Sequence, residues 1–253
     1  MSEFAVSSIV CVCVLSGAVL GGLLRAVLPE HHMSEQSRQI VNVAIGLVAT
    51  LAALVLGLLV ASAKTSFDAR NEEVKETGTK LILLDRVLRQ YGPQTKELRS
   101  LLQVLTERRI EHRWKAVKAS EEATTLRADA SSSELIRAGL WKLASDTDAQ
   151  RWLLARALTL TADIEQARWL LVEGEESSIP TVFLVILVFW LTAIFVALGL
   201  FAPRNATVYA VILVCGLSVS TAVLMILEMD QPFEGILQVP SAPLVSALEE
   251  MRR

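Results

Sequence analysis

The chain has 253 residues, 53% of them hydrophobic, with 24 basic and 27 acidic side chains and a formal net charge of −3. The charged side chains are concentrated between residues 64 and 178, which hold 19 of the basic and 19 of the acidic residues. This distribution excludes an ordinary soluble globule, a disordered chain and a strongly basic nucleic-acid binder. It predicts a membrane protein with one polar, charge-balanced region.

Four segments are long and apolar enough to cross a bilayer as helices, which requires about 20 residues. These uncharged segments cover residues 4–24, 39–63, 177–203 and 205–227. We therefore predict two transmembrane hairpins, closed by residues 25–38 and by the short loop 202–205. The first span is expected to be retained, because the head Met1-Ser2-Glu3 lacks the basic residues of a signal peptide.

Basic residues near the predicted spans indicate their orientation, because cytoplasmic flanks carry an excess of lysine and arginine. Three lie on the side of the two hairpin loops, namely Arg25, Arg38 and Arg204. Seven lie on the side of the polar region, namely Lys64, Arg70, Lys75, Lys80, Arg168, Arg252 and Arg253. The sequence therefore predicts that the polar region and both termini are cytoplasmic.

The polar region begins with a helical pattern that continues from the second span. Apolar residues recur at steps of three and four through Leu81, Leu84, Leu88 and Tyr91. Because no proline interrupts residues 63–91, we expect one long helix that ends at Gly92-Pro93.

Three further helices are expected in the polar region. The first runs from Leu98 to about Val117, and the second is capped by Ser133 and carries Leu135, Ile136, Leu140 and Leu143. The third has a capping box formed by Thr147 and Gln150. No segment alternates with period two, so the predicted fold class is all-α. The predicted parts are a transmembrane hairpin at 4–63, a cytoplasmic helical domain at 64–176, a second hairpin at 177–227 and a cytoplasmic tail at 228–253.

Three stretches of the chain carry a family resemblance, namely residues 51–68, 84–114 and 226–244. The most specific pattern is Glu-x-Asp-x-Pro-Phe-x-Gly, which follows the last span at residues 228–235. Together these stretches resemble the bacterial bestrophin-like family of four-span membrane proteins. The resemblance extends over nearly the whole chain.

This resemblance implies a remote relation to bestrophins, which are anion channels assembled as rings with the same order of two spans, a helical cytoplasmic region and two spans. It implies an oligomeric ion channel or channel-like protein of the bacterial inner membrane. Bestrophins bind calcium through a run of acidic residues after the last span. Here Glu228, Asp230 and Glu234 are spaced out, with Pro232 and Phe233 between them, so the resemblance does not extend to calcium gating.

Small residues at four-residue spacing mark candidate helix-packing faces, since they let helix backbones approach closely in lipid. Gly17 and Gly21 form such a pair in the first span. Ala53 and Gly57 belong to a stripe in the second span that also contains Ala49 and Ala61. Packing within one subunit and packing between subunits of a ring both remain open. Asn42, a polar residue at the start of the second span, is the candidate for lining a pore.

The cytoplasmic end of the last span is a candidate inner mouth of a pore, with the residues Lys64, Asp68, Glu228, Asp230, Pro232 and Phe233. Glu228 and Asp230 lie at the negative pole of a helix, where carboxylates are disfavoured and need a compensating cation. An ion pair with Lys64 is one interpretation. A ring of carboxylates that filters ions is the other, and Phe233 is expected to anchor the tail in the membrane interface.

No motif indicates catalysis, a cofactor or a tightly bound metal. Phosphate-binding and dinucleotide-binding loops and nucleophile elbows are absent from the sequence, so we do not expect an enzyme. Glu30-His31-His32 offers too few ligands for a metal site. Trp114, Trp152 and Trp169 are expected to be buried core residues rather than stacking platforms for nucleic acid.

Two functions follow from the sequence. The first is an oligomeric ion channel in the lipid bilayer, formed by several copies of the chain. The alternative is a membrane-anchored sensor or scaffold whose helical domain binds a cytoplasmic protein partner.

Overall fold

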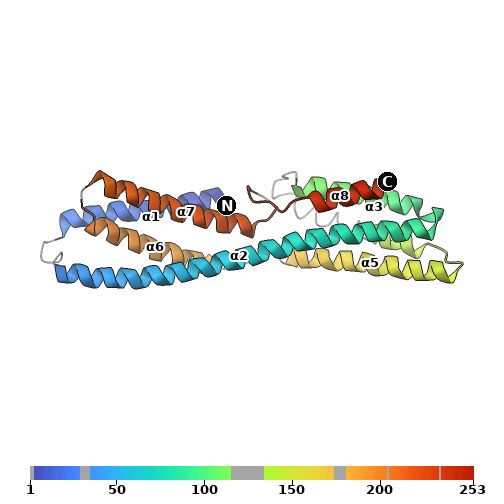
Figure 1. Cartoon of the computed structure of the whole chain (residues 1–253), viewed down its shortest axis with the longest axis horizontal. Coiled ribbons are helices and arrows are strands. Elements are labelled where there is room, and N and C mark those ends of the chain that lie inside the picture. The colour runs from blue at the N-terminus through green and yellow to red at the C-terminus, as the bar shows by residue number, and fades with distance from the viewer. Residues whose placement is uncertain (1–2, 29–34, 115–133, 174–180, 204, 234) are drawn as a thin grey trace. The chain divides into compact units, whose positions relative to one another are not determined.

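A computed structural model describes residues 3–28, 35–114, 134–173, 181–203, 205–233 and 235–253, and all regular structure in these residues is helical. Residues 134–141 are helical, and a 3₁₀ turn (η2) covers Pro93–Thr95. The other helices (Figure 1) are α1 (Glu3–Val27), α2 (Glu35–Tyr91), α3 (Lys96–Trp114), α5 (Asp148–Glu173), α6 (Thr181–Phe201), α7 (Ala206–Asp230) and α8 (Ala242–Arg252).

Four of these helices are long and apolar enough to cross a membrane, namely α1, α2, α6 and α7. Each overlaps one of the uncharged segments of the sequence. Helix α2 runs without interruption through 57 residues, which confirms the prediction of one helix from the second span to Tyr91.

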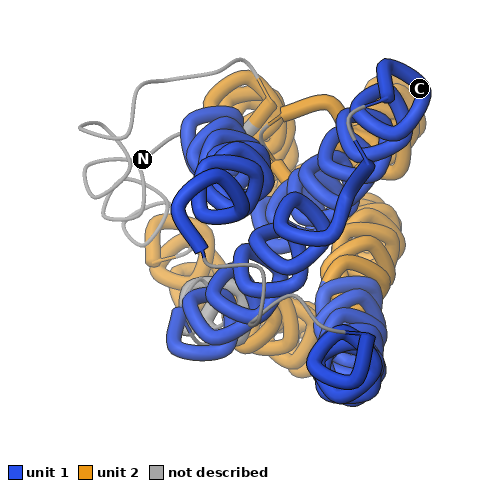
Figure 2. The backbone as a smooth tube through the Cα atoms, turned by 90° about the vertical axis from the view of Figure 1, so that its left-hand side faces the viewer, with its two compact units in different colours: residues 1–66, 177–231 blue, residues 67–176, 232–253 orange. Residues whose placement is uncertain are grey.

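The chain divides into two compact units (Figure 2). Unit 1 consists of Met1–Ser66 and Ser177–Gln231, and unit 2 consists of Phe67–Glu176 and Pro232–Arg253. The chain from Pro232 onward thus belongs to the same unit as the charged middle of the chain.

In unit 1, α1 packs against both α6 and α7. Glycines allow the α1–α6 approach: a Cβ atom added at Gly21 would lie 1.9 Å from the Val196 carbonyl oxygen, and one at Gly199 would lie 2.0 Å from that of Ala18. Only residues without a side chain fit at such a backbone contact. On the α7 side, the buried Ser7 hydroxyl donates a 2.9 Å hydrogen bond to the Ser220 carbonyl.

Basic residues cover the C-terminal end of α6. The Arg25 guanidinium donates a hydrogen bond to the Ala202 carbonyl, and the Arg38 guanidinium lies 5.9 Å from the centre of the Phe201 ring. A helix C-terminus has unsatisfied carbonyl groups and a partial negative charge. Both arginines therefore stabilise this end of the helix.

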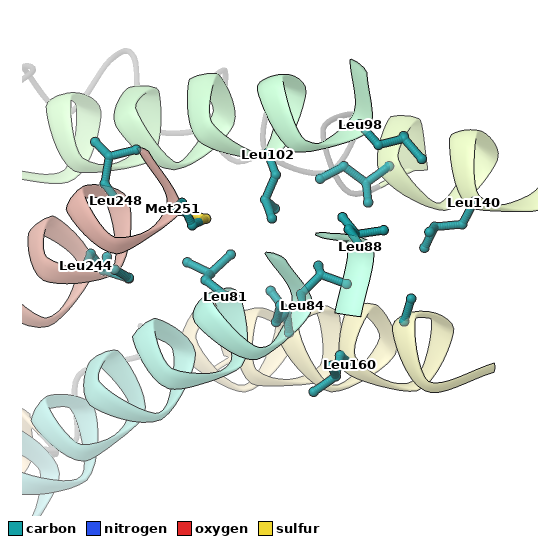
Figure 3. Close-up of a cluster of buried hydrophobic side chains, with 14 of the residues drawn as sticks. Leu81, Leu84, Leu88, Leu98, Leu102, Leu140, Leu160, Leu244, Leu248 and Met251 are labelled. Carbon is teal, nitrogen blue, oxygen red and sulfur yellow. The ribbon is translucent and has the colours of Figure 1, made fainter. Parts of the chain in front are cut away.

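The core of unit 2 comes from α2, α3, α5, α8 and residues 134–141. One series of buried residues in each of α2 and α5 is spaced alternately by four and three, as in a coiled-coil seam. In α2 the series is Arg70, Val74, Thr77, Leu81, Leu84 and Leu88, and in α5 it is Leu153, Ala157, Leu160, Ile164 and Ala167. Gly78, Asp85 and Tyr91 of α2 and Thr161 of α5 are buried beside these series. Figure 3 shows how leucines of several helices gather in this core.

Local signals fix two helix ends in unit 2. Gly92, with a φ of 132°, takes a conformation that favours glycine, and it follows the last residue of α2. Thr95 then donates to the Leu88 carbonyl at 2.5 Å. At the start of α5, the backbone N–H of Gln150 donates to the Thr147 hydroxyl at 3.2 Å, and the backbone N–H of Thr147 donates to the Gln150 Oε1 at 3.3 Å. These two bonds confirm the capping box.

The expectation of three buried tryptophans is wrong for Trp152, which is 66% exposed. The neighbouring Leu153 is the buried one, at 8% exposed, and consecutive residues of a helix point about 100° apart. Trp114 is partly buried, whereas the side chain of Trp169 lies outside the described residues.

Candidate functional site

The apolar part of α2 has one face that is covered by the rest of the chain. Ala52, Leu59 and Ala63 are at most 5% exposed. The other sides of the helix are open to the surroundings of the single chain, and they fall into two faces of different chemistry.

The first open face, here called the large-apolar face, carries bulky side chains on an arc of about 80°. Its members are between 43% and 75% exposed, and they are Ile40, Val43, Leu47, Leu51, Leu54 and Leu58. Such side chains are suited to contact with lipid tails.

The second open face, here called the small-residue face, lies on another arc of about 80°. It contains the exposed residues Asn42, Gly46, Ala49, Ala53 and Gly57. Apart from the local backbone of α2, no atom of the described residues lies within 4 Å of a Cβ added at Gly46 or at Gly57. The arc continues through Val60 to Lys64, so an amide stands at one end of this face and an ammonium group at the other.

The candidate packing residues thus occupy two different environments. Gly17 and Gly21 lie against α6 of the same chain, with a Cβ at Gly17 falling 3.0 Å from the Thr192 carbonyl oxygen. Ala53 and Gly57 are exposed on the small-residue face, together with Asn42. Sequence reasoning missed Gly46, although its spacing of four from Asn42 was a signal for the same face.

The candidates for an inner mouth are divided between the two units. Lys64 is exposed, Glu228 is 3% exposed and Asp230 is partly buried, and all three belong to unit 1. A buried carboxylate requires a compensating charge or hydrogen bonds, and each of these three residues interacts with neighbouring groups. The pairing of Lys64 with a carboxylate stays a prediction. Asp68 is exposed in unit 2.

Pro232 and Phe233 form part of a turn in unit 2. The Val239 amide donates to the Pro232 carbonyl at 2.8 Å and closes the turn. Trp114 holds it from two sides, because its indole nitrogen donates to the Val239 carbonyl at 2.7 Å and its ring meets that of Phe233 edge-on at 5.5 Å. Phe233 therefore has a protein partner, which the expectation of an interfacial anchor did not include.

A polar cluster in unit 2 lies within residues 84–114, one of the stretches that carry the family resemblance. Asp85 of α2 is 2% exposed. Arg99 of α3 binds its carboxylate through Nε at 2.7 Å and Nη2 at 3.1 Å, and Arg89 adds a contact at 3.2 Å. No local sequence pattern indicated this pair, because Asp85 and Arg99 lie 14 residues apart.

No group of three or more histidine, cysteine or acidic side chains converges in the part of the chain that the structure describes. His31 and His32 lie outside the described residues. The geometry therefore offers no cluster from which to build a metal centre among those residues.

These features define a helical, multi-pass membrane protein with a charged helical unit. The chain belongs to the Bestrophin-like domain family, whose model matches residues 12–244. This match confirms the resemblance that the sequence carries.

Solved structures agree with this family. Two mutant crystal structures of a bacterial Bestrophin homolog from Klebsiella pneumoniae each have a TM-score of 0.64 to this chain. The first is 15% identical to this chain, and the match covers 94% of this chain and 97% of the homolog's chain. The second is 14% identical, and the match covers 95% of this chain and 99% of the homolog's chain. At such low identity the likeness shows a shared fold. No curated protein sequence gives a significant match.

Proposed function

We propose that several copies of this chain assemble into an ion channel of the bacterial inner membrane. The small-residue face of α2 is the observation that carries the proposal. Membership of the bestrophin-like family supports it, because that family resembles the ring-forming bestrophin channels.

The contrast between the two open faces of α2 argues for an assembly. The large-apolar face fits lipid, whereas glycine and alanine offer lipid little contact area and let another helix approach closely. An amide such as that of Asn42 is also costly to leave in hydrocarbon without a partner. Copies arranged with their small-residue faces inward would direct Asn42 and Lys64 toward a shared, hydrated path.

A pair of neighbouring substitutions tests this arrangement. Ala53→Phe places a bulky ring on the small-residue face, and Leu54→Phe places the same ring on the large-apolar face. We expect Ala53→Phe to lower ion flux in liposomes by about ten-fold or more, since pore width controls conduction. Leu54→Phe should leave the flux within about two-fold of the wild type, because surface changes away from special features have small effects.

Native mass spectrometry of both variants provides the control, because the subunit number must be unchanged for the flux to be compared. Equal flux in the two variants would show that α2 does not line the conduction path. A wild-type protein without any flux would reject the channel.

The second candidate function is a membrane-anchored sensor or scaffold that binds a cytoplasmic protein. Two exposed tryptophans in unit 2 favour it, since Trp141 is 70% and Trp152 is 66% exposed. Exposed aromatic residues are common at protein interfaces. A folded, assembled protein with no measurable flux would support this function.

The proposed orientation can be measured with cysteine labelling. In a variant without Cys11, Cys13 and Cys215, a cysteine is introduced at the exposed Ala149 of unit 2 or at Ala206, the first residue of α7. The seven-to-three excess of basic residues predicts that Ala149→Cys is protected from a membrane-impermeant thiol reagent in intact cells and that Ala206→Cys reacts. If only Ala149→Cys reacted, unit 2 would lie on the outer side of the membrane and the proposed orientation would be wrong.

A further inference from the structure

Helix α8 is docked in unit 2 by an apolar face and by contacts at its two ends. Leu244, Leu248 and Met251 lie toward Leu81 of α2 and Leu102 of α3 (Figure 3). These side chains make α8 part of the core rather than a separate tail.

The two ends of α8 are held through its backbone. At the C-terminal end, the Met251 carbonyl accepts hydrogen bonds from Gln103 at 2.7 Å and from Arg99 at 3.4 Å. At the N-terminal end, Gly78 of α2 lies so close that a Cβ there would be 2.9 Å from the Pro243 carbonyl oxygen.

The buried ion pair beneath α8 is complete without α8. Both charged partners of Asp85, namely Arg99 and Arg89, come from α3 and α2. Helix α8 contributes only the Met251 carbonyl, which can bind water once it is exposed. The disruption of a buried ion pair is costly when one charge stays buried without its partner. Undocking of α8 would leave Asp85 with both arginines, so this cost does not arise.

The ion pairs of α8 also oppose undocking weakly. Its ion pairs, Arg86 with Glu250 and Arg252 with Glu107, have side chains that are 40% to 60% exposed, and such pairs contribute little to stability. With 11 residues, α8 is too short to be a stable helix alone in water. Its folding and its docking are consequently one event.

We propose that α8 is a detachable strap, which undocks and unfolds as one unit while α2, α3 and α5 stay packed. Undocking uncovers an apolar strip of α2 and α3 that contains Leu81 and Leu102. The strap is a conformational device of unit 2 and does not depend on ion conduction.

Hydrogen exchange of the full-length protein, followed by mass spectrometry, tests the strap. In the wild type, residues 242–252 should exchange faster than residues 81–91 of α2 and 98–106 of α3, because local opening needs less free energy than global unfolding. Gln103→Leu removes one hydrogen bond to the Met251 carbonyl. It should accelerate exchange in 242–252 by about three- to ten-fold and leave the other two segments unchanged.

Gly78→Ala acts at the other end of α8. It distinguishes local undocking of the strap from a general destabilisation of unit 2. Alanine favours the helical state of α2, but its Cβ presses on Pro243. Exchange should again rise in 242–252 alone. Gln166→Leu, at an exposed position of α5, is the control and should change no segment. Equal acceleration of all three segments by Gln103→Leu or Gly78→Ala, including a variant that unfolds altogether, would overturn the proposal.

Discussion

Replacing Gly21 by alanine should destabilise the protein by about 1–3 kcal/mol, although alanine is the better helix former. The added Cβ would lie 1.9 Å from the Val196 carbonyl oxygen and 2.8 Å from the Leu200 nitrogen. Because these are backbone atoms, no side-chain rotation can relieve the overlap, and α1 must move away from α6. Thermal or denaturant unfolding in detergent measures the loss.

The adjacent glycine provides a matched control. A Cβ at Gly22 has its nearest neighbour, the Gly199 carbonyl oxygen, at 4.0 Å, which is an ordinary contact distance. Gly22→Ala should therefore leave stability unchanged or raise it by up to about 1 kcal/mol. Because Gly21 contacts its own chain, Gly21→Ala should not change the subunit number by native mass spectrometry. Equal stability of the two variants would show that α1 and α6 are not closely packed at Gly21.

Removal of the Asp85 carboxylate should have a still larger effect. Breaking a buried ion pair from one side typically costs about 3–5 kcal/mol, because the remaining charge loses its partner. In Asp85→Ala the guanidinium of Arg99, whose side chain is 24% exposed, would stay in the core of unit 2 without an anion. Loss of helical circular dichroism at a lower denaturant concentration would report the effect.

Two comparisons isolate the buried pair. Glu72→Ala breaks the exposed pair with Lys75, whose side chains are 74% and 50% exposed, and should change stability by no more than about 1 kcal/mol. The double variant Asp85→Leu/Arg99→Leu should cost less than the two single changes added together, since it leaves no unpaired charge. Additive losses would mean that Asp85 and Arg99 do not stabilise each other.

The helices and several of their ends could be predicted from the sequence because their signals are local. The spans follow from uncharged apolar runs, and the uninterrupted helix α2 follows from the absence of proline before Gly92-Pro93. Thr147 and Gln150 are three residues apart, so their capping box depends on a single turn of chain. Each of these features requires only neighbouring residues to interact.

The candidate site could be predicted only in part. The spacing of Ala53 and Gly57 indicated a packing face, and the position of Asn42 indicated a polar end. The same kind of spacing in Gly17 and Gly21 could not show that these glycines are covered by α6, whereas the face of α2 is open. Small residues allow another helix to approach closely, but their spacing in the sequence does not indicate which helix packs against them.

The amino-acid sequence alone determined the family, the four helices that are long and apolar enough to cross a membrane, and the helical nature of the charged region. Tertiary structure decided the surroundings of individual residues. It placed Gly199 against Ala18, Asp85 against Arg99, and Trp114 against Phe233, while it left Trp152 exposed. These contacts join residues that are at least 14 positions apart in the chain. Their formation depends on how whole helices pack, so no local pattern of apolar or small residues could specify them.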